Sequence, residues 1–293
     1  MLLGPAVDGL NVHTEGIYVD VTFGGGGHST EILNRLGNGK LFAFDQDKDA
    51  LANVGADTRI VLIPHNFKYL AEKLAELQVV EVDGLLADLG VSSHQFDVAE
   101  RGFSIRFNAD LDMRMDQSQQ LTARDILNYY PEQELMRVFR EYGELNSARK
   151  MATEIVRVRG EKFIETSDEL KSVVSRFAPR AKENTFYAQL FQALRIEVND
   201  ELAALKTLLE QSVQVLKKGG RLVVISYHSL EDRLVKNFIN SGNFEGEIQK
   251  DFFGKPIGLV FKSITRKPTV PDEKEVEVNP RSRSAKMRIA EKL

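Results

Sequence analysis

The chain of 293 residues contains no cysteine. Disulfide bonds, cysteine-ligated zinc and a cysteine nucleophile are therefore excluded, and a reducing compartment, the cytoplasm, is expected. Long hydrophobic runs are also missing, because stretches such as 222–225 are far shorter than the ~20 residues that span a membrane. The first residues show neither a basic segment nor a sustained apolar run, so no signal peptide is predicted.

Positive charge is not in excess either. The 39 Lys and Arg residues stand against 43 Asp and Glu residues, which gives a net charge of −4. This balance excludes a protein that coats nucleic acid through bulk charge, although a local basic face is still possible. Hydrophobic residues make up 42% and charged residues 28% of the chain, as in a globular protein rather than a disordered or rod-like one.

Short apolar segments alternate with helix-length segments through the first hundred residues. Strands are expected at 16–21, 41–45, 59–63 and 84–88, and helices at 29–36 and 69–77. Uniformly apolar strands separated by helices predict a parallel sheet that is covered on both faces.

The alternation stops after residue 106 and returns near residue 198. The segment between is expected to hold four helices and no strand: 122–129, 131–142, 147–159 and 167–177, with Thr122 and Ser167 as N-caps. Further along, the expected elements are a helix at 200–216 closed by 217–220, a strand at 221–226, a helix at 230–240, and strands at 259–264 and 285–290 around a charged loop at 272–277. The prediction is an α/β fold with a doubly wound sheet (1–106 and 198–293) and an inserted all-helical domain (107–197).

The strongest local signal is four consecutive glycines, 24–27, between a strand and a helix. Backbone without Cβ atoms can approach a ligand closely, and the free N–H groups of the following helix favour a carboxylate or phosphate. Asp45 ends the second strand, where an acidic residue commonly accepts hydrogen bonds from ribose hydroxyls. Ser29 replaces the third glycine of the dinucleotide fingerprint, so a ribose is indicated but NAD is not. The alternative is a flexible turn.

Two further segments follow strands on the same predicted edge. Asp88–Gln95 lies where doubly wound sheets bind ligands, and its alternative role is to cap the next segment. His228 is either a catalytic or a structural histidine, and Ser229 with Asp232 resembles a capping box.

No metal site is predicted. The five histidines show no HExxH motif and no paired spacing. Residues 45–49 resemble the start of a calcium loop, but Ala50 and Ala56 stand where such a loop needs glycine and glutamate.

Seven ordered blocks, taken together, resemble the bacterial 16S ribosomal RNA (cytosine-N4) methyltransferase family. They are DVTFGGGGHS (20–29), DLGVSS (88–93), RGFS (101–104), LDMRMD (111–116), FQALRI (191–196), ISYHSLEDR (225–233) and NPRSRSAK (279–286). The resemblance covers nearly the whole chain. Two departures are visible: the segment before Gly9 is shorter than in the family, and Tyr227 stands where phenylalanine is more usual.

The resemblance implies a class I S-adenosylmethionine-dependent methyltransferase with a helical insertion. It implies a transfer to the exocyclic N4 of a cytidine in the decoding region of 16S rRNA, within the small ribosomal subunit, with no metal and no membrane. Carried over by motif, the family's cofactor contacts fall on Gly26, Gly27, His28, Asp45, Phe67, Asp88 and Gln95.

The residues also fit this chemistry independently. Transfer from a sulfonium needs in-line alignment more than an acid or a metal. The lack of cysteine excludes the covalent route to C5 of a pyrimidine, and an exocyclic amine needs no such adduct. Hydrogen-bond acceptors on the amine would raise its nucleophilicity, and Asp88 and the backbone carbonyls of 88–92 are the candidates. Whether Asp88 holds the cofactor, the amine or both stays open.

RNA binding must rely on local basic patches. Two are visible: the C-terminal cluster Arg281, Arg283, Lys286 and Arg288, and a set of arginines and lysines at 137–159 in the helical insertion, diluted by glutamates. The C-terminal cluster is the predicted RNA contact, and the alternative for both patches is a solvated, charge-balanced surface. Two rival functions are an assembly factor without activity and a nucleotide-dependent oxidoreductase. The intact Gly26, Gly27 and Asp45 disfavour the first rival, and Ser29 disfavours the second.

Overall fold

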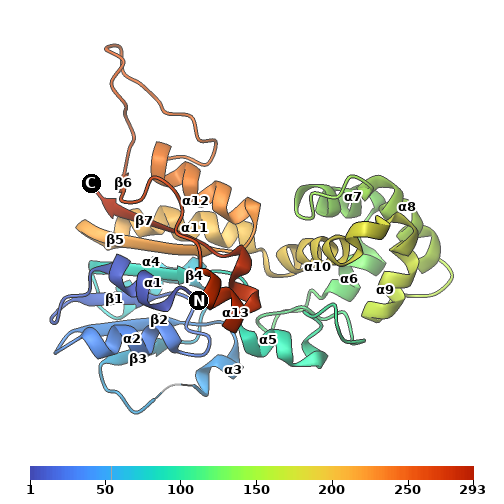
Figure 1. The fold of residues 1–293 in the computed structure, drawn as a ribbon, viewed down its shortest axis with the longest axis horizontal. Helices are drawn as coiled ribbons and strands as arrows, with labels where there is room; N and C mark the ends of the chain where they lie inside the picture. The colour runs from blue at the N-terminus through green and yellow to red at the C-terminus, as the bar shows by residue number, and fades with distance from the viewer. Residues whose placement is uncertain (54) are drawn as a thin grey trace. The chain divides into compact units, whose positions relative to one another are not determined.

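The computed structural model describes residues 1–53 and 55–293, with the backbone alone described at Leu51. In these residues the strands form one seven-stranded sheet in the order β3-β2-β1-β4-β5-β7-β6 (Figure 1). The strands are β1 (Ile17–Asp20), β2 (Lys40–Phe44), β3 (Ile60–Ile63), β4 (Val82–Asp88), β5 (Leu216–Ser226), β6 (Phe261–Ser263) and β7 (Lys286–Lys292). Strands β1 to β5 are parallel, and β7 pairs antiparallel with both β5 and β6.

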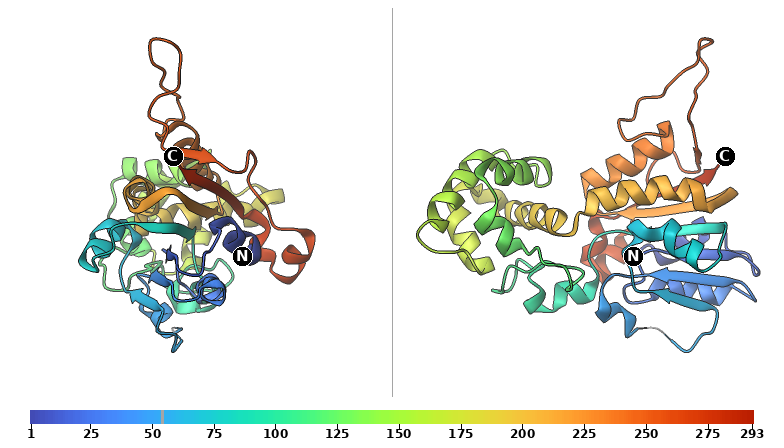
Figure 2. Two further views of the ribbon diagram at one scale, coloured as in Figure 1. Left: turned by 90° about the vertical axis from the view of Figure 1, so that its left-hand side faces the viewer. Right: turned by 180° about the vertical axis from the view of Figure 1, so that it is seen from behind.

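Helices cover both faces of this sheet, because strands β1, β2, β4 and β5 bury apolar side chains on both sides. On one face α1 (Leu3–Leu10) and α2 (Gly27–Arg35) pack against residues such as Tyr18 and Leu86. On the other face α4 (Leu70–Glu76), α11 (Glu201–Val215) and α12 (Ser229–Ser241) pack against residues such as Leu85 and Val224 (Figure 2). The predicted doubly wound α/β sheet is confirmed.

The chain divides into two compact units. The sheet unit comprises residues 1–90 and 202–293, and the helical unit comprises residues 91–201. The helical unit contains α5 (Ser93–Asp97), α6 (Ala123–Tyr129), α7 (Glu132–Glu141), α8 (Ala148–Arg159), α9 (Ser167–Val174) and α10 (Glu183–Asn199) around its own core. It begins before the expected boundary at 107 because Phe103 is buried in that core and Val91, Phe96 and Ile105 pack against it.

Shorter elements complete the fold. They are α3 (Lys48–Leu51) and α13 (Glu273–Val278), and the 3₁₀ helices η1 (Phe67–Tyr69), η2 (Ala99–Arg101), η3 (Ser175–Phe177), η4 (Arg180–Lys182) and η5 (Pro280–Ser284).

Several expected helix ends are wrong. Thr166, not Ser167, is the N-cap of α9, since its hydroxyl accepts the N–H of Glu169. Helix α11 ends at Val215, and residues 217–220 lie in β5, where the pairing with β4 shifts register. The charged loop expected at 272–277 is helix α13, which Asp272 caps by accepting the N–H of Glu275. The expected N-cap of α6, Thr122, is confirmed, and it forms a reciprocal capping box with Asp125.

Candidate cofactor site

The candidate site lies at the carboxyl edge of the sheet unit, where the chain reverses the order in which it adds strands. β1 is flanked by β2 on one side and by β4 on the other. Loops that leave such neighbouring strands diverge to opposite faces of the sheet, so a crevice forms between them. The ends of β1, β2, β4 and β5 therefore supply the residues that follow.

A buried carboxylate fixes the start of the glycine loop. Asp20, the last residue of β1, is fully buried. Its Oδ1 accepts the N–H of Thr22 (3.1 Å), and its Oδ2 accepts the hydroxyl of Ser29 (2.7 Å). The Thr22 hydroxyl in turn accepts the N–H of Asp88 (2.7 Å), which joins the ends of β1 and β4. Asp20 and Ser29 thus position the loop, a role that the sequence patterns did not reveal.

The glycines of this loop have separate roles. Gly26 has a φ of +75° and is the N-cap of α2, and a Cβ on it would lie 3.1 Å from the ring of Phe23. A Cβ on Gly25 or Gly27 would meet no atom within 4 Å. The conformation of the backbone therefore requires glycine at 26, whereas at 25 and 27 the absence of side chains leaves room for a ligand beside the first turn of α2.

Asp45 follows β2 and faces the glycine loop. Its Oδ2 accepts the N–H of Gly24 (2.7 Å), and its Oδ1 accepts the N–H of Asp47 (2.8 Å). Burial raises the pKa of Asp45 from 3.8 to about 6, although both backbone hydrogen bonds oppose that shift. Each carboxylate oxygen keeps a further lone pair, so the group can accept hydrogen bonds from a pair of vicinal hydroxyls.

Phe67 lies in η1, directly after β3, and packs in part against the core of the sheet unit. Two amides hold this segment in place. Asn66 donates to Oε1 of Gln46 (2.7 Å), the residue after Asp45, and Gln211 of α11 donates to the carbonyl of Lys68 (2.6 Å). The structure therefore ties the segment that carries Phe67 to the end of β2. A cofactor contact of Phe67 stays a prediction.

Asp88 ends β4, and the two oxygens of its carboxylate have different partners. Oδ1 accepts the hydroxyl of Tyr227 (2.5 Å), which follows β5. Oδ2 lies 3.7 Å from Nδ1 of His28 in α2 and 3.8 Å from the N-terminal ammonium of Met1, and it accepts no hydrogen bond from the described residues. Burial raises the pKa of Asp88, and the nearby His28 opposes this rise. Burial beside Asp88 also raises the pKa of Tyr227, so its phenol stays protonated as a donor.

Gln95 belongs to the helical unit. Ser92 is the N-cap of α5, its hydroxyl accepts the N–H of Gln95 (3.2 Å), and Gln95 Oε1 accepts the N–H of Ser92 (3.0 Å). The capping alternative for this segment is therefore confirmed. A cofactor contact of Gln95 stays a prediction.

His228 is the N-cap of α12. Its Nδ1 accepts the N–H of Glu231 (3.4 Å), so the structural interpretation of this histidine accounts for its position. The expected capping box of Ser229 with Asp232 is wrong, because the helix already begins at Ser229 and Asp232 instead accepts from Nε of Arg288 (2.7 Å).

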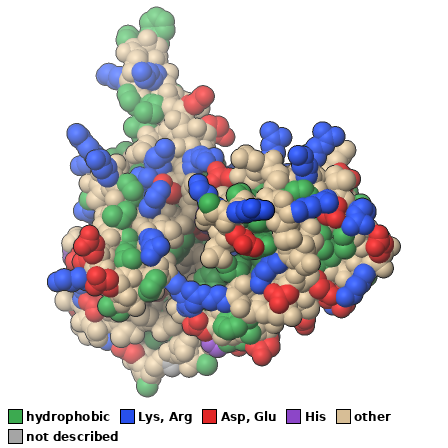
Figure 3. Space-filling model, turned by 45° about the vertical axis from the view of Figure 1, so that its right-hand side comes forward, with side chains coloured by type: hydrophobic (Ala, Val, Ile, Leu, Met, Phe, Trp, Pro, Cys, Tyr) green, Lys and Arg blue, Asp and Glu red, His purple; other side chains and the backbone are tan. Residues whose placement is uncertain are grey.

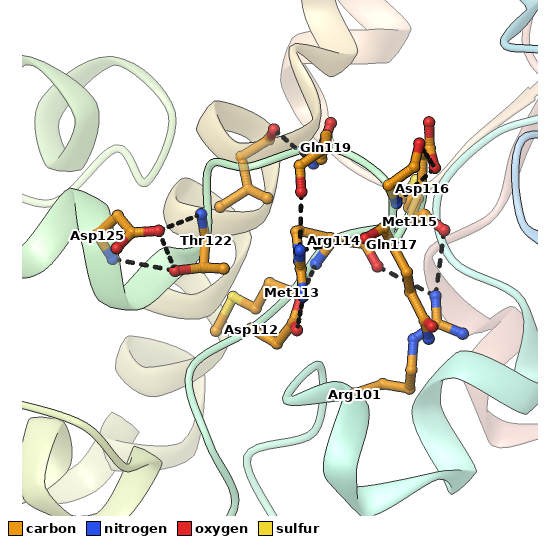
Figure 4. Close-up of polar contacts among 12 residues, drawn as sticks. Arg101, Asp112, Met113, Arg114, Met115, Asp116, Gln117, Gln119, Thr122 and Asp125 are labelled. Carbon is orange, nitrogen blue, oxygen red and sulfur yellow. Dashed lines mark hydrogen bonds and ion pairs between the residues drawn. The ribbon is translucent and has the colours of Figure 1, made fainter.

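The LDMRMD block forms a fixed loop inside the helical unit (Figure 4). Arg114 donates to both carboxylate oxygens of Asp112, at 2.8 and 2.7 Å. Arg101 donates to the carbonyl of Arg114 (3.0 Å), and Asn199 of α10 donates to that of Met113 (2.8 Å). Met113 is buried with a φ of +60°, so these contacts hold a conformation that few residues adopt unaided. The block has a structural role here.

The four residues of the C-terminal basic cluster differ in their exposure and in their ion pairs. Arg288 is bonded to Asp232, and Nζ of Lys286 lies 3.6 Å from the same carboxylate. Arg283 is exposed in η5, whereas Arg281 is partly buried there. Much of the charge on Lys286 and Arg288 is therefore balanced within the sheet unit.

The order of the seven strands, with β7 antiparallel between β5 and β6, is the fold of class I S-adenosylmethionine-dependent methyltransferases, as predicted. The glycine loop, Asp45 and Phe67 leave space and acceptors that fit this cofactor.

The chain belongs to the MraW methylase family, whose sequence model matches residues 1–293. Its relatives include three proteins called ribosomal RNA small subunit methyltransferase H. The one from Flavobacterium johnsoniae is 58% identical over 100% of this chain and 97% of its own. The one from Cytophaga hutchinsonii is 56% identical over 100% and 98%. The one from Bacteroides thetaiotaomicron is 52% identical over 100% and 96%. The predicted family and methyltransferase activity are confirmed.

None of the helices in the described residues is long and apolar enough to span a membrane.

Proposed function

We propose that this chain transfers the methyl group of S-adenosylmethionine to the exocyclic N4 of a cytidine in the decoding region of 16S rRNA, within the small ribosomal subunit. Full-length relatives at 52–58% identity, all named as small subunit rRNA methyltransferases, support the substrate. The structural observation that carries the proposal is the carboxylate of Asp88, next to the glycine loop. Its Oδ1 accepts the hydroxyl of Tyr227, and its Oδ2 accepts no hydrogen bond from the described residues but lies 3.7 Å from His28 and 3.8 Å from the N-terminal ammonium. Such a substrate places the reaction in the cytoplasm.

The cofactor contacts follow from the chemistry of each position. Asp45 would accept the ribose hydroxyls, and the backbone of Gly26 and Gly27, with open space beside Gly27, would face the methionine end. Phe67 offers an aromatic ring to the adenine. His28, Asp88 and Gln95 complete the proposed set. When bound, S-adenosylmethionine supplies the electrophilic methyl group.

Asp88 would act on the target amine through Oδ2. The lone pair of a cytosine amine is conjugated with the ring and is a weak nucleophile. A carboxylate oxygen that accepts one N–H increases the electron density on the nitrogen and aligns its lone pair, and it can take the proton once the new bond has formed. Tyr227 fixes the other oxygen, so Oδ2 is presented in one orientation.

The test is methylation of purified small subunits by Asp88→Asn at saturating S-adenosylmethionine. Asparagine keeps an Oδ1 acceptor for Tyr227 and replaces only Oδ2, by an N–H donor that would face the amine. We expect kcat to fall by about 10²-fold or more, in the range of lost acid–base assistance. Tyr227→Phe removes the bond that fixes Oδ1 but keeps Oδ2 as a carboxylate oxygen, so it should lower kcat less than Asp88→Asn does.

Two results would contradict these roles. Full activity of Asp88→Asn at saturation would leave Asp88 a cofactor contact at most. A methylated nucleoside other than N4-methylcytidine from the wild-type reaction would disprove the proposed substrate position.

A further inference from the structure

A long arm, residues 243–260, joins α12 to β6 and projects from the sheet unit (Figures 1 and 2). Two aromatic residues lie at its tip: Phe252 is 97% exposed and Phe253 is 83% exposed. Their rings meet edge to face, with centroids 5.6 Å apart. Rings in this position contribute almost nothing to the core. A cluster of large apolar side chains in solvent is a mark of a binding surface.

The tip is held in a defined shape by its own hydrogen bonds. The Asp251 carboxylate accepts the N–H groups of Phe253 (2.9 Å) and Lys255 (2.8 Å). Gly254, with a φ of +78°, donates to the carbonyl of Asp251 (3.0 Å) and makes the turn possible. An isolated bridge between Lys250 and Pro256 closes the hairpin below it. The two rings are therefore presented before any partner binds.

The base of the arm is anchored to α12. Phe244 stacks on Phe238, with ring centroids 5.1 Å apart and an interplanar angle of 21°. Asn237 donates to the carbonyl of Phe244 (2.8 Å). The arm is thus fixed at its base as well as at its tip.

Two lysines and one aspartate carry the charges beside the two rings. Lys250 and Lys255 are both exposed, and no ion-pair partner for either occurs in residues 1–53 or 55–293. The only acidic residue among 250–255 is Asp251, and two backbone amides bind its carboxylate. Figure 3 shows hydrophobic side chains at the end of the arm and Lys or Arg side chains below them. The tip therefore combines aromatic faces with free cations.

This combination fits single-stranded nucleic acid better than a second protein chain. Two aromatic side chains offer about 300–500 Å² of apolar surface, at 150–250 Å² each. A stable protein interface needs about 800 Å² from each partner. Stacking of unpaired bases, by contrast, needs only ring faces, with cations for the phosphates.

We propose that the arm tip binds unpaired bases of the RNA substrate, with Phe252 and Phe253 as stacking surfaces and Lys250 and Lys255 as phosphate contacts. This inference rests on the proposed function, because it takes ribosomal RNA as the substrate. It adds an RNA contact in the sheet unit that is separate from the cofactor residues.

The test compares full-length variants for binding to a labelled single-stranded RNA oligonucleotide and to its duplex. Alanine at both Phe252 and Phe253 should weaken single-strand binding by about 5- to 150-fold for each base that loses its stacking partner, which corresponds to 1–3 kcal/mol. The double leucine variant should be similarly weak, since it is apolar but cannot stack. The double tyrosine variant should bind like the wild type. S-adenosylmethionine affinity should be unchanged in all of them.

The contribution of the two lysines is measured separately, through the salt dependence of RNA binding. Lys250→Gln/Lys255→Gln should flatten the dependence of log affinity on log salt by about 0.7 for each lost phosphate contact. Wild-type RNA affinity in the double alanine or the double leucine variant would overturn the proposal. Loss of a dimer in sedimentation, with RNA affinity unchanged, would assign the tip to a second copy of the chain. If the wild type does not methylate small subunits at all, the proposed function itself fails.

Discussion

At the scale of single residues, Asp45 makes the binding of the cofactor dependent on pH. Burial raises its pKa to about 6, so its carboxylate becomes protonated between pH 7 and pH 5. A protonated carboxyl loses acceptor capacity for ribose hydroxyls. We expect the affinity for S-adenosylmethionine, measured by calorimetry, to fall as pH decreases through 6, by up to about tenfold per unit. Asp45→Asn should be weaker at pH 7.5 and should lose this part of the dependence.

The raised pKa of Asp45 has the opposite effect on the stability of the unliganded protein, which it increases as pH falls. A carboxyl whose pKa is higher in the folded state than its ordinary value of 3.8 binds protons more tightly when folded. Its contribution to the free energy of unfolding therefore increases as pH falls from above 6 toward 4. Parallel pH profiles of wild type and Asp45→Asn, in affinity and in stability, would overturn both expectations.

The sequence predicts the acidic residues at the strand ends better than the hydrogen bonds that hold them in place. Asp45 and Asp88 could be predicted because each follows an apolar strand, and the ends of parallel strands share one edge. Asp20 also ends a strand, but its bond to Ser29 depends on how closely α2 packs to β1, which no local pattern encodes. The bond between Tyr227 and Asp88 joins residues far apart in the chain, so only the assembled sheet reveals it.

At the scale of elements, a substitution in the glycine loop can distinguish two requirements for glycine: the conformation of the backbone and the space beside it for a ligand. Gly27 is the first residue of α2, and a Cβ there meets no protein atom within 4 Å. Gly27→Ala should therefore fold with equal or slightly greater stability. If the space belongs to the cofactor, the affinity for S-adenosylmethionine should drop roughly tenfold or more, since overpacking costs about 1–3 kcal/mol.

Gly4→Ala in α1 is the matched control, because a Cβ on this glycine is equally unobstructed and no cofactor contact is proposed for it. It should change neither thermal stability nor cofactor affinity by much. Unchanged affinity in Gly27→Ala as well would reduce the glycine run to a turn.

Helices α10 and α13 were missed in the sequence for different physical reasons. Helix α10 was not expected, although it buries Phe186, Leu190 and Leu194 at helical spacing. Its hydrophobic residues occupy more than one face, which weakens the amphipathic signal from which helices are inferred. Helix α13 has no buried residue, so only its cap at Asp272 could have indicated it. Strands were predicted well because β1 to β4 are short and uniformly apolar.

At the scale of the whole molecule, binding to a polyanion must come from local groups, since the net charge is −4. Arg281 and Arg283 belong to η5, and Asp232 balances their neighbours Lys286 and Arg288. We expect Arg281→Ala/Arg283→Ala to weaken binding to small subunits and to flatten its salt dependence by roughly 0.7–0.9 per lost contact. Cofactor affinity should stay at the wild-type value.

Arg288→Ala provides the contrast, because its main effect should be a lower melting temperature through loss of the bond to Asp232. If instead this variant loses RNA affinity while the Arg281/Arg283 pair keeps it, the RNA contact lies on β7 rather than on η5.

The order of the strands along the chain has a consequence for the folding of the protein during its translation. β4 carries Asp88, but its neighbour β5 and the next strand, β7, are encoded after the whole of residues 91–201. During translation the glycine loop and Asp88 leave the exit tunnel long before Tyr227 and β7 do. The helical unit, with its own core, can fold in that interval. A nascent chain therefore carries the glycine loop and Asp88 before the two strands that complete this edge of the sheet, β5 and β7, have been made.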